Sequence, residues 1–309
     1  MLRWTLERRG QQRVATPPRG SFPVAAPVIA QPRAGTLDFT ATWIGHSTVL
    51  LQMGGVNVLT DPMFSQRASP VQWMGPRRVM DPALALESLP PLDVLVLSHN
   101  HYDHLDKASV RRLARAHPDA AWVVPLELGA TVRRWGVREI VELDWWQEAD
   151  VRSVRVTSTP ARHFSARSLG DRCDTLWCGY AMEVAGGRAY FAGDTAYHPQ
   201  FGEIAARCGP FDLVMMPIGA YDPRWFMHVM HADPEEAVQA YLDLTSATAA
   251  PLPLMLAIHW GTFRLTDEPM DEPPRRAAAA WEQHGLDPSR LWLAAFGETR
   301  SWKATEEAR

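Results

Sequence analysis

Ser98-His99-Asn100-His101-Tyr102-Asp103-His104-Leu105 follows directly after the apolar run Val94-Leu95-Val96-Leu97 and decides the fold. An aliphatic run of this kind is typical of a strand buried on both faces, and ligand-bearing loops in such sheets lie at strand ends. In extended backbone the side chains at i and i+2 point the same way, so His99 and His101 can bind one ion, while Asp103 and His104 reach a neighbouring one beyond the bend. A short histidine-rich tract can also be a surface accident. Four ligand-type side chains after a buried strand are costly to leave unpaired, so we predict a metal site.

Length and composition are those of an ordinary globular protein. The 309 residues are enough for a large core, and 46% of them are hydrophobic and 21% charged. The formal net charge of −4 gives no general basic field, so we expect no nucleic-acid partner. The 13 tryptophans can fill a core, line an apolar cleft or lie at a membrane interface.

We expect a cytoplasmic location, with peripheral membrane contact left open. No apolar run approaches the roughly 18–20 residues of a transmembrane helix, and the N-terminal residues lack the continuous apolar core of a secretory signal. The cysteines Cys173, Cys178 and Cys208 follow no zinc-finger spacing and fit small buried thiols in a reducing compartment.

The chain divides into an arm over residues 1–35 and one domain over residues 36–309. The arm is proline-rich and has no period of 2 or 3.6, so we expect it to be poorly ordered or draped over the surface, where it can contact a partner or a membrane. Residues 37–300 contain no repeat and no linker, which favours a single domain. The connection over 63–91 is long, and connections of this length inside a compact domain usually have a function.

Strand-like and helix-like segments alternate along the domain. Asp106 can cap one helix, and Asp233-Pro234-Glu235-Glu236 has the cap, the proline and the glutamate of another helix start. Further helices are predicted over 126–135, 201–207 and 275–284. Strands are predicted over 39–44, 49–53, 56–60, 94–97, 121–124, 139–143, 154–159, 177–184, 189–192, 213–217, 255–258 and 291–293.

Three ligand-type residues later in the chain also lie just after predicted strands, as the stretch 98–105 does. His163, Asp194 and His259 each lie just beyond the carboxyl end of a strand-like run. Taken singly, either histidine could be structural, and Asp194 in Gly-Asp-Thr could merely cap a turn. Taken together with the stretch 99–104, seven ligand-type side chains are expected to gather at one edge of the sheets.

In the order His-x-His-x-Asp-His, His, Asp, His, the chain resembles the metallo-β-lactamase superfamily. The resemblance implies an α/β fold, the αββα four-layer sandwich, with a metal site at one edge. It also implies two Zn²⁺ ions, with other divalent transition metals as alternatives. One ion would be bound by His99, His101 and His163 and the other by Asp103, His104 and His259, with Asp194 bridging them.

Motifs outside the ligands narrow the resemblance to the N-acyl-phosphatidylethanolamine-hydrolysing phospholipase D family. It rests on the stretches 42–49, 60–65, 75–78, 98–106, 219–227, 231–237 and 258–263. It implies a phospholipid or other phosphodiester substrate, release of N-acylethanolamine and phosphatidic acid, and a homodimer. His228 stands where the family usually has a lysine, and Met230 where a polar residue is common, which puts the lipid head group in doubt.

A site of this kind would hydrolyse a phosphodiester without a protein nucleophile. A hydroxide bridging the two ions would attack phosphorus, with Asp194 orienting it and Asp103 holding one ion. His231 is the candidate for contacting the phosphate or protonating the leaving oxygen, because an imidazole with a pKa near about 6.5 can donate at neutral pH. A plain surface histidine is the alternative. Asp61 and His46 are candidates for fixing imidazole tautomers, or for simple turn roles.

Candidate substrate contacts lie in and beside the stretch 219–228. An aromatic and apolar cluster with one arginine suits a substrate that carries a phosphate and an apolar tail, and a buried loop packed on the sheet is the alternative. Arg77 and Arg78 could also attract a phosphate or be solvated surface residues. The candidates in the stretch are Tyr221, Arg224, Trp225 and His228.

Two other functions remain open at this level. The first is a lactonase or sugar-phosphate hydrolase of the same fold, in which the same metal site would hydrolyse a different bond of a different substrate. A zinc-stabilised binding protein without turnover is the non-enzymatic alternative. Nuclease relatives of the fold need nucleic-acid contacts, for which the net charge gives no support.

Overall fold

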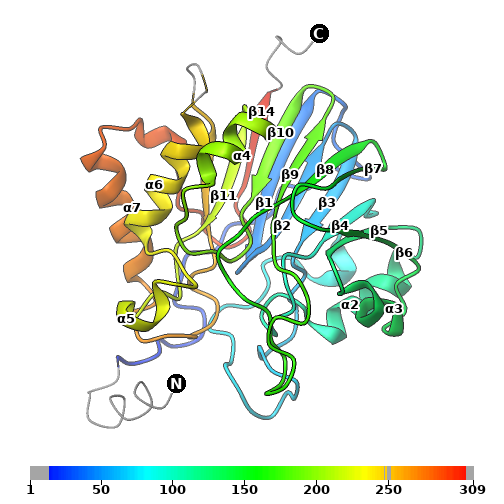
Figure 1. Cartoon of the computed structure of the whole chain (residues 1–309), viewed down its shortest axis with the longest axis horizontal. Coiled ribbons are helices and arrows are strands. Elements are labelled where there is room, and N and C mark those ends of the chain that lie inside the picture. Colours follow the sequence, from blue (N-terminus) through cyan, green and yellow to red (C-terminus); the bar gives the residue numbers. More distant parts are fainter. Residues whose placement is uncertain (1–13, 247, 249–251, 304–309) are drawn as a thin grey trace.

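Two β-sheets lie face to face between two layers of helices in the computed structural model (Figure 1). The structure describes residues 14–246, 248 and 252–303. The first sheet has the order β14-β1-β2-β3-β4-β5-β6, with β1 (Asp38–Gly45), β2 (Thr48–Met53), β3 (Val56–Thr60), β4 (Val94–Val96), β5 (Ala121–Pro125), β6 (Glu139–Leu143) and β14 (Thr299–Lys303). The second has the order β13-β12-β11-β10-β9-β8-β7, with β7 (Glu148–Val151), β8 (Val154–Thr159), β9 (Gly179–Val184), β10 (Gly187–Phe191), β11 (Leu213–Pro217), β12 (Leu254–Ile258) and β13 (Leu291–Trp292).

Helices occupy the outer faces of the two sheets. Figure 1 shows α2 and α3 on the side of the first sheet, and α4, α6 and α7 on the side of the second. The helices are α2 (Lys107–Ala116), α3 (Gly129–Arg134), α4 (Phe201–Cys208), α5 (Arg224–Met227), α6 (Pro234–Thr245) and α7 (Glu272–Gln283), with short 3-10 turns at η1 (Leu86–Ser88) and η2 (Pro288–Arg290). This arrangement is the predicted αββα sandwich.

Strand β2 shows why the sequence produces two apolar layers. Its side chains alternate between faces. Val49 and Leu51 pack into the core between the sheets, whereas Leu50 packs under α2 and α3 with Val110 and Leu113. A strand buried on both faces has no polar side, so it reads as a continuous apolar run.

Each sheet combines an antiparallel half with a parallel half. Strands β14 to β3 pair antiparallel and β3 to β6 parallel, while β7 to β10 pair antiparallel and β10 to β13 parallel. Parallel strands end at the same edge of a sheet, and ligand-bearing loops collect there. Figure 1 shows the loop after β3 (cyan), the loop between β8 and β9 (green) and α5 at one end of the molecule.

The arm is draped along the domain where it is described. Val24 forms a parallel bridge with Phe296, and the backbone N–H of Ala25 donates to the Phe296 carbonyl over 2.8 Å. Further along, the N–H of Ala30 donates to Gln52 Oε1 over 2.9 Å. The part of the arm over residues 1–13 lies outside the described residues, so the expectation of poor order stays a prediction there.

Most sequence-based elements agree with the structure, with differences at boundaries. The predicted caps are present: Asp106 accepts from the N–H groups of Ala108 and Ser109, and Asp233 and Glu236 form a complete capping box. Strands β7 and β14 were not predicted. The prediction of buried cysteines is wrong for Cys173, which is exposed. Among the described helices, none has both the length and the apolar character that crossing a membrane requires.

The layer between the sheets should carry much of the stability. Leu51→Ala removes a fully buried side chain, so we expect the free energy of unfolding to fall by about 2–5 kcal/mol, as measured by urea titration. Leu169→Ala is the matched control, because Leu169 is fully exposed and its loss should change stability by less than about 0.5 kcal/mol. Equal losses in the two variants would contradict this assignment of the core.

Candidate metal centre

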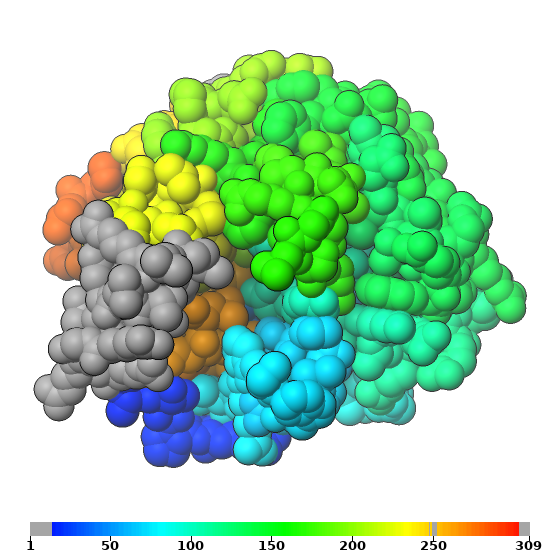
Figure 2. Space-filling view, turned by 60° about the horizontal axis from the view of Figure 1, so that its bottom comes forward, coloured from blue at the N-terminus to red at the C-terminus, as the bar shows by residue number. Residues whose placement is uncertain are grey.

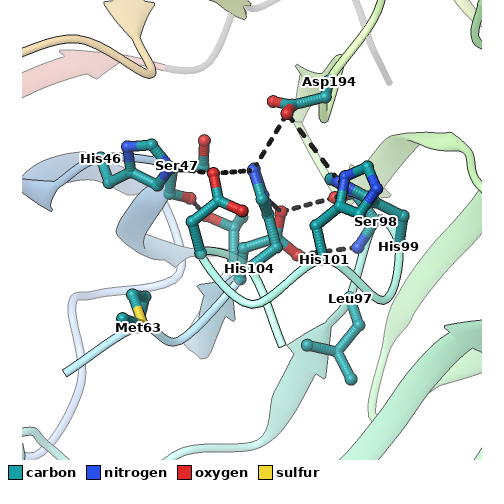
Figure 3. Close-up of polar contacts among 12 residues, drawn as sticks. His46, Ser47, Met63, Leu97, Ser98, His99, His101, His104 and Asp194 are labelled. Carbon is teal, nitrogen blue, oxygen red and sulfur yellow. Dashed lines mark hydrogen bonds and ion pairs between the residues drawn. The ribbon is translucent and has the colours of Figure 1, made fainter. Parts of the chain in front are cut away.

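Polar side chains from both sheets converge at the carboxyl ends of their strands. His99 to His104 follow β4, and three more residues follow β8, β10 and β12 respectively: His163, Asp194 and His259. Figure 3 shows Asp194 above the loop that carries His99, His101 and His104. The seven predicted ligand residues therefore form one cluster, contributed by two different sheets.

Three histidine nitrogens form the first group of ligand atoms. His99 Nε2 lies 2.8 Å from His101 Nδ1, and His163 Nε2 lies 3.1 Å from the same atom. Nitrogens bound to one tetrahedral zinc at 2.0–2.1 Å lie about 3.3 Å apart. The three rings are thus close to the spacing that one ion requires, as predicted from the sequence.

The second group combines a carboxylate with two imidazoles. Asp103 Oδ2 lies 3.4 Å from both His104 Nε2 and His259 Nε2. Asp194 Oδ2 lies 3.1 Å from each of these two nitrogens. The same oxygen is 3.8 Å from both His99 Nε2 and His163 Nε2. Asp194 therefore stands between the two groups, in the position predicted for a bridging ligand.

A buried network around Asp61 orients two of the imidazoles. Asp61 accepts from the backbone N–H of Ser98 over 2.7 Å and from its hydroxyl over 2.6 Å. The Ser98 hydroxyl in turn accepts from His99 Nδ1 at 2.8 Å, and His104 Nδ1 donates to Asp61 over 2.6 Å. With both Nδ1 atoms used as donors, each Nε2 keeps its lone pair for an ion.

Two further hydrogen bonds, to His163 and to Asp103, also orient predicted ligand side chains. His163 Nδ1 donates to the Met230 carbonyl over 2.8 Å, which leaves its Nε2 as the acceptor. His46 Nε2 lies 3.0 Å from Asp103 Oδ2. Burial lowers the pKa of His46 to about 3, so the neutral ring can donate to that carboxylate. Asp61 and His46 thus both contact ligand residues, as the sequence suggested.

Arg167 was missed by the sequence analysis. Its guanidinium donates to the carbonyls of Asn100 (2.6 Å) and Leu105 (2.8 Å) and lies 3.9 Å from the centre of the Tyr102 ring. The Tyr102 hydroxyl donates back to the Arg167 carbonyl over 2.9 Å. Arg167 therefore ties the loop between β8 and β9 to both ends of the ligand loop. No local motif marks such a residue, because its partners are backbone carbonyls far away in sequence.

The two buried carboxylates of the cluster, Asp103 and Asp194, create a negative field that favours binding of a positive charge. Burial opposes ionisation of Asp194 and Asp103, but His104 and His259 outweigh it and hold both carboxyl pKa values well below their usual range. Burial likewise opposes protonation of His259, yet Asp194 and Asp103 raise its pKa to about 9. Two buried carboxylates thus attract protons onto neighbouring imidazoles, and a divalent cation would satisfy the same demand.

Unpartnered ligand atoms also fit a metal. His104 Nε2, His259 Nε2 and Asp194 Oδ1 are buried and have no hydrogen-bond partner among the described residues. Orphaned polar atoms of this kind are costly unless something binds them. The residues therefore fit the predicted metal centre.

His231 lies beside the cluster. Its ring centre is 4.9 Å from that of His163 and 5.5 Å from that of His259, and its Nδ1 is buried without a partner. Burial lowers the pKa of His231 well below its ordinary value. This differs from the ordinary pKa that the sequence analysis assumed. A neutral ring favours hydrogen bonding to a phosphate over proton donation.

The four predicted substrate contacts divide into buried and exposed residues. The Tyr221 side chain is buried, and its hydroxyl donates to Glu272 over 2.7 Å. The Arg224 guanidinium donates to the His231 carbonyl and pairs with Glu236. Both side chains make contacts within the protein, and their assignment to substrate stays a prediction. The remaining two, Trp225 and His228, are exposed.

Arg78 likewise makes its contacts within the protein. Its side chain is buried, and it donates to the carbonyls of Ser65, Met80 and Met63. Its guanidinium lies 4.9 Å from the ring centre of Phe263. Burial lowers the pKa of Arg78 to about 10. This arginine braces the long connection after β3 and is not available to a lipid phosphate.

Comparison with known families agrees with this geometry. Residues 56–260 match the family described as beta-lactamase superfamily domain. The chain belongs to the β-lactamase superfamily. The match ends one residue beyond His259, so it includes all seven predicted ligand residues.

Several relatives cover much of the chain. "Uncharacterized protein Rv0906" of Mycobacterium tuberculosis is 44% identical over 284 residues, which are 91% of this chain and 73% of that protein. N-acyl-phosphatidylethanolamine-hydrolyzing phospholipase D 1 of Caenorhabditis elegans is 39% identical over 233 residues, which are 72% of this chain but 64% of that protein. Among solved structures, the metallo hydrolase Igni18 of Ignicoccus hospitalis has a TM-score of 0.62 at 20% identity, covering 87% of this chain and all of Igni18.

The fold and the cluster of ligand-type side chains together indicate metal-dependent hydrolysis. This superfamily member is a metal-dependent hydrolase, with clustered histidine and aspartate groups able to bind metal. The resemblance to the metallo-β-lactamase superfamily that was read from the sequence is confirmed.

The Asp61 network should control metal affinity. Asp61→Asn removes the charge that His104 Nδ1 donates to, so we expect metal affinity to fall by about 10–100-fold in a chelator competition. Asp212→Asn is the control, because Asp212 accepts from the backbone of Arg188 instead of from a ligand residue. Unchanged affinity in Asp61→Asn would remove the network from metal binding.

Proposed function

We propose that this chain hydrolyses phosphodiesters of the N-acyl-phosphatidylethanolamine type and releases N-acylethanolamine and phosphatidic acid. The 39% identity to the Caenorhabditis elegans enzyme of that name supports the substrate class. The observation that carries the proposal is the position of Asp194 Oδ2 between two complete groups of ligand atoms. A pair of metal ions about 3.5–4 Å apart is typical of phosphodiester hydrolases.

The ligand residues have separate tasks in this proposal. The first ion would be held by His99, His101 and His163, the second by Asp103, His104 and His259, and Asp194 would contact both. We propose zinc for both positions, because imidazole and carboxylate ligands at this spacing suit it. Divalent ions, when bound, polarise a phosphoryl oxygen and make water a nucleophile near neutral pH.

The protein's own side chains orient the reaction around these ligands. His46 holds Asp103, and Asp61 holds His104, so the carboxylate and the imidazole keep fixed orientations. We propose that His231 donates an N–H to a phosphoryl oxygen, and Arg224 fixes the residue through the His231 carbonyl. We therefore assign His231 to binding and positioning the phosphate.

A substrate panel tests the reaction class. The metal-loaded chain should hydrolyse N-acyl-phosphatidylethanolamine in micelles and a small soluble phosphodiester. Removing an outer partner of a metal ligand costs about 10–100-fold, so Asp194→Asn, which removes the shared charge, should cost more on both substrates. Hydrolysis of lactones or sugar phosphates without any phosphodiester cleavage would reject the substrate class and leave the metal centre intact.

Trp225 tests the lipid part of the proposal. Its side chain is 41% exposed, three residues before His228 and six before His231 in sequence. Trp225→Ala should reduce the rate on micellar lipid by at least about 10-fold while changing the rate on the small phosphodiester by less than about 2-fold, because only the lipid has an acyl chain to contact. Trp225→Phe should retain most of the lipid activity. Equal losses on both substrates would give Trp225 a structural role instead.

A further inference from the structure

A basic groove lies beside the metal centre and contains none of its seven candidate ligands. The groove has a volume of about 630 Å³ and runs between α2 and the loop after β3. In Figure 2 the cyan loop and the teal segment that contains α2 lie side by side on the face turned forward. The cationic side chains that line it are Lys107, Arg111, Arg112, Arg115 and Arg167.

The positive charge of the groove is largely unbalanced. Asp106 is the one carboxylate of its lining, and its oxygens accept from the Ser65 N–H and from the N–H groups that begin α2. Arg112 pairs with Glu87. Within the described part of the chain, no carboxylate lies at ion-pair distance from Lys107, Arg111 or Arg115. The whole chain has a net charge of −4, so this excess is local.

A solvated helix face does not account for this arrangement. Arg111 and Arg115 are four residues apart on α2, where like charges repel each other. They also face a concave wall, with Trp135 and Tyr102 among its lining. Arg167 also lines the groove and is itself fixed to the ligand loop through the Asn100 and Leu105 carbonyls. A bound anion would relieve this repulsion between like charges.

We propose that the groove is a second, non-catalytic binding site for a phosphate monoester dianion. Arginine guanidinium groups present paired N–H donors that match phosphate oxygens, and Arg111 and Arg115 supply two of them from successive turns of one helix. Lys107, at the start of α2, adds a point charge beside the Trp135 ring, 5.9 Å from its centre. The site does not depend on which bond the metal centre cleaves.

The phosphate could belong to a soluble ester or to a lipid head group. The loop that forms one wall continues from Gln72 into Trp73 and Met74, whose side chains are 75% and 57% exposed. This loop is held by Arg67, which donates to the Gln72 and Gly75 carbonyls. A fixed loop with exposed apolar side chains beside a cationic groove suits an anionic lipid surface. The experiment therefore presents the same monoester in both forms.

The test uses the full-length, metal-loaded chain at low ionic strength. Binding of glycerol 3-phosphate is measured by calorimetry, and binding to phosphatidylcholine vesicles with and without about 20 mol% phosphatidic acid by sedimentation. Arg111→Gln/Arg115→Gln removes two groove charges. Arg275→Gln/Arg290→Gln removes one charge from α7 and one from η2, which follows α7 in sequence. Figure 1 shows α7 on the opposite side of the molecule from α2. Metal content and the urea midpoint of each variant show that it is folded.

We expect the groove variant to bind the monoester about 10–30-fold more weakly, while the control binds as the wild type does. Loss for glycerol 3-phosphate identifies a site for soluble esters, and loss confined to phosphatidic acid vesicles identifies a lipid site. His101→Ala separates the groove from the metal centre. Binding that His101→Ala abolishes and the groove variant retains would overturn the proposal, and so would equal binding by both arginine variants.

Discussion

The close approach of two strand ends, one from each sheet, is the constraint on which the metal centre depends. Asp194 can reach both ligand groups only because Gly193 brings the end of β10 against the end of β4. Gly193 has φ +61°, and a Cβ there would lie 2.6 Å from Ser98 Cβ and 2.9 Å from the Cys178 carbonyl oxygen. Any side chain would therefore push the sheets apart at this edge. The residue before the shared ligand has to be glycine for steric reasons as well as conformational ones.

The same contact explains how the outer network stays buried. Ser98 meets Gly193 on one side and Asp61 on the other, so its hydroxyl cannot turn to solvent. It must donate to Asp61 and accept from His99, and this fixes the His99 tautomer. A polar network with every member satisfied is rigid in a low-dielectric interior. The packing of the sheets thus helps to fix the orientation of the ligand side chains.

Much of the fold was predictable because its signals are local. Buried strands read as apolar runs, and Asp106 and Asp233 mark helix starts through caps that involve only neighbouring residues. The convergence of the seven candidate ligand residues was also predictable, since each follows a strand. Strand β14 was missed because it pairs with β1 across more than 250 residues of sequence. Arg167 was missed for a similar reason: its partners are backbone carbonyls, which leave no pattern in the sequence.

Residue type alone does not show which arginines are free to bind a ligand. An arginine in an aromatic loop suggests a phosphate partner, but Arg224 finds Glu236 and the His231 carbonyl, and Arg78 finds three carbonyls of its own loop. Lys107, Arg111 and Arg115 have no ion-pair partner among the described residues, and all three lie on α2. Net charge was equally uninformative there, because it averages over the surface, whereas an anion responds to the field within about 10 Å at moderate salt. Anion recognition in this chain is therefore decided by which arginines the fold leaves unpaired, and that depends on tertiary contacts.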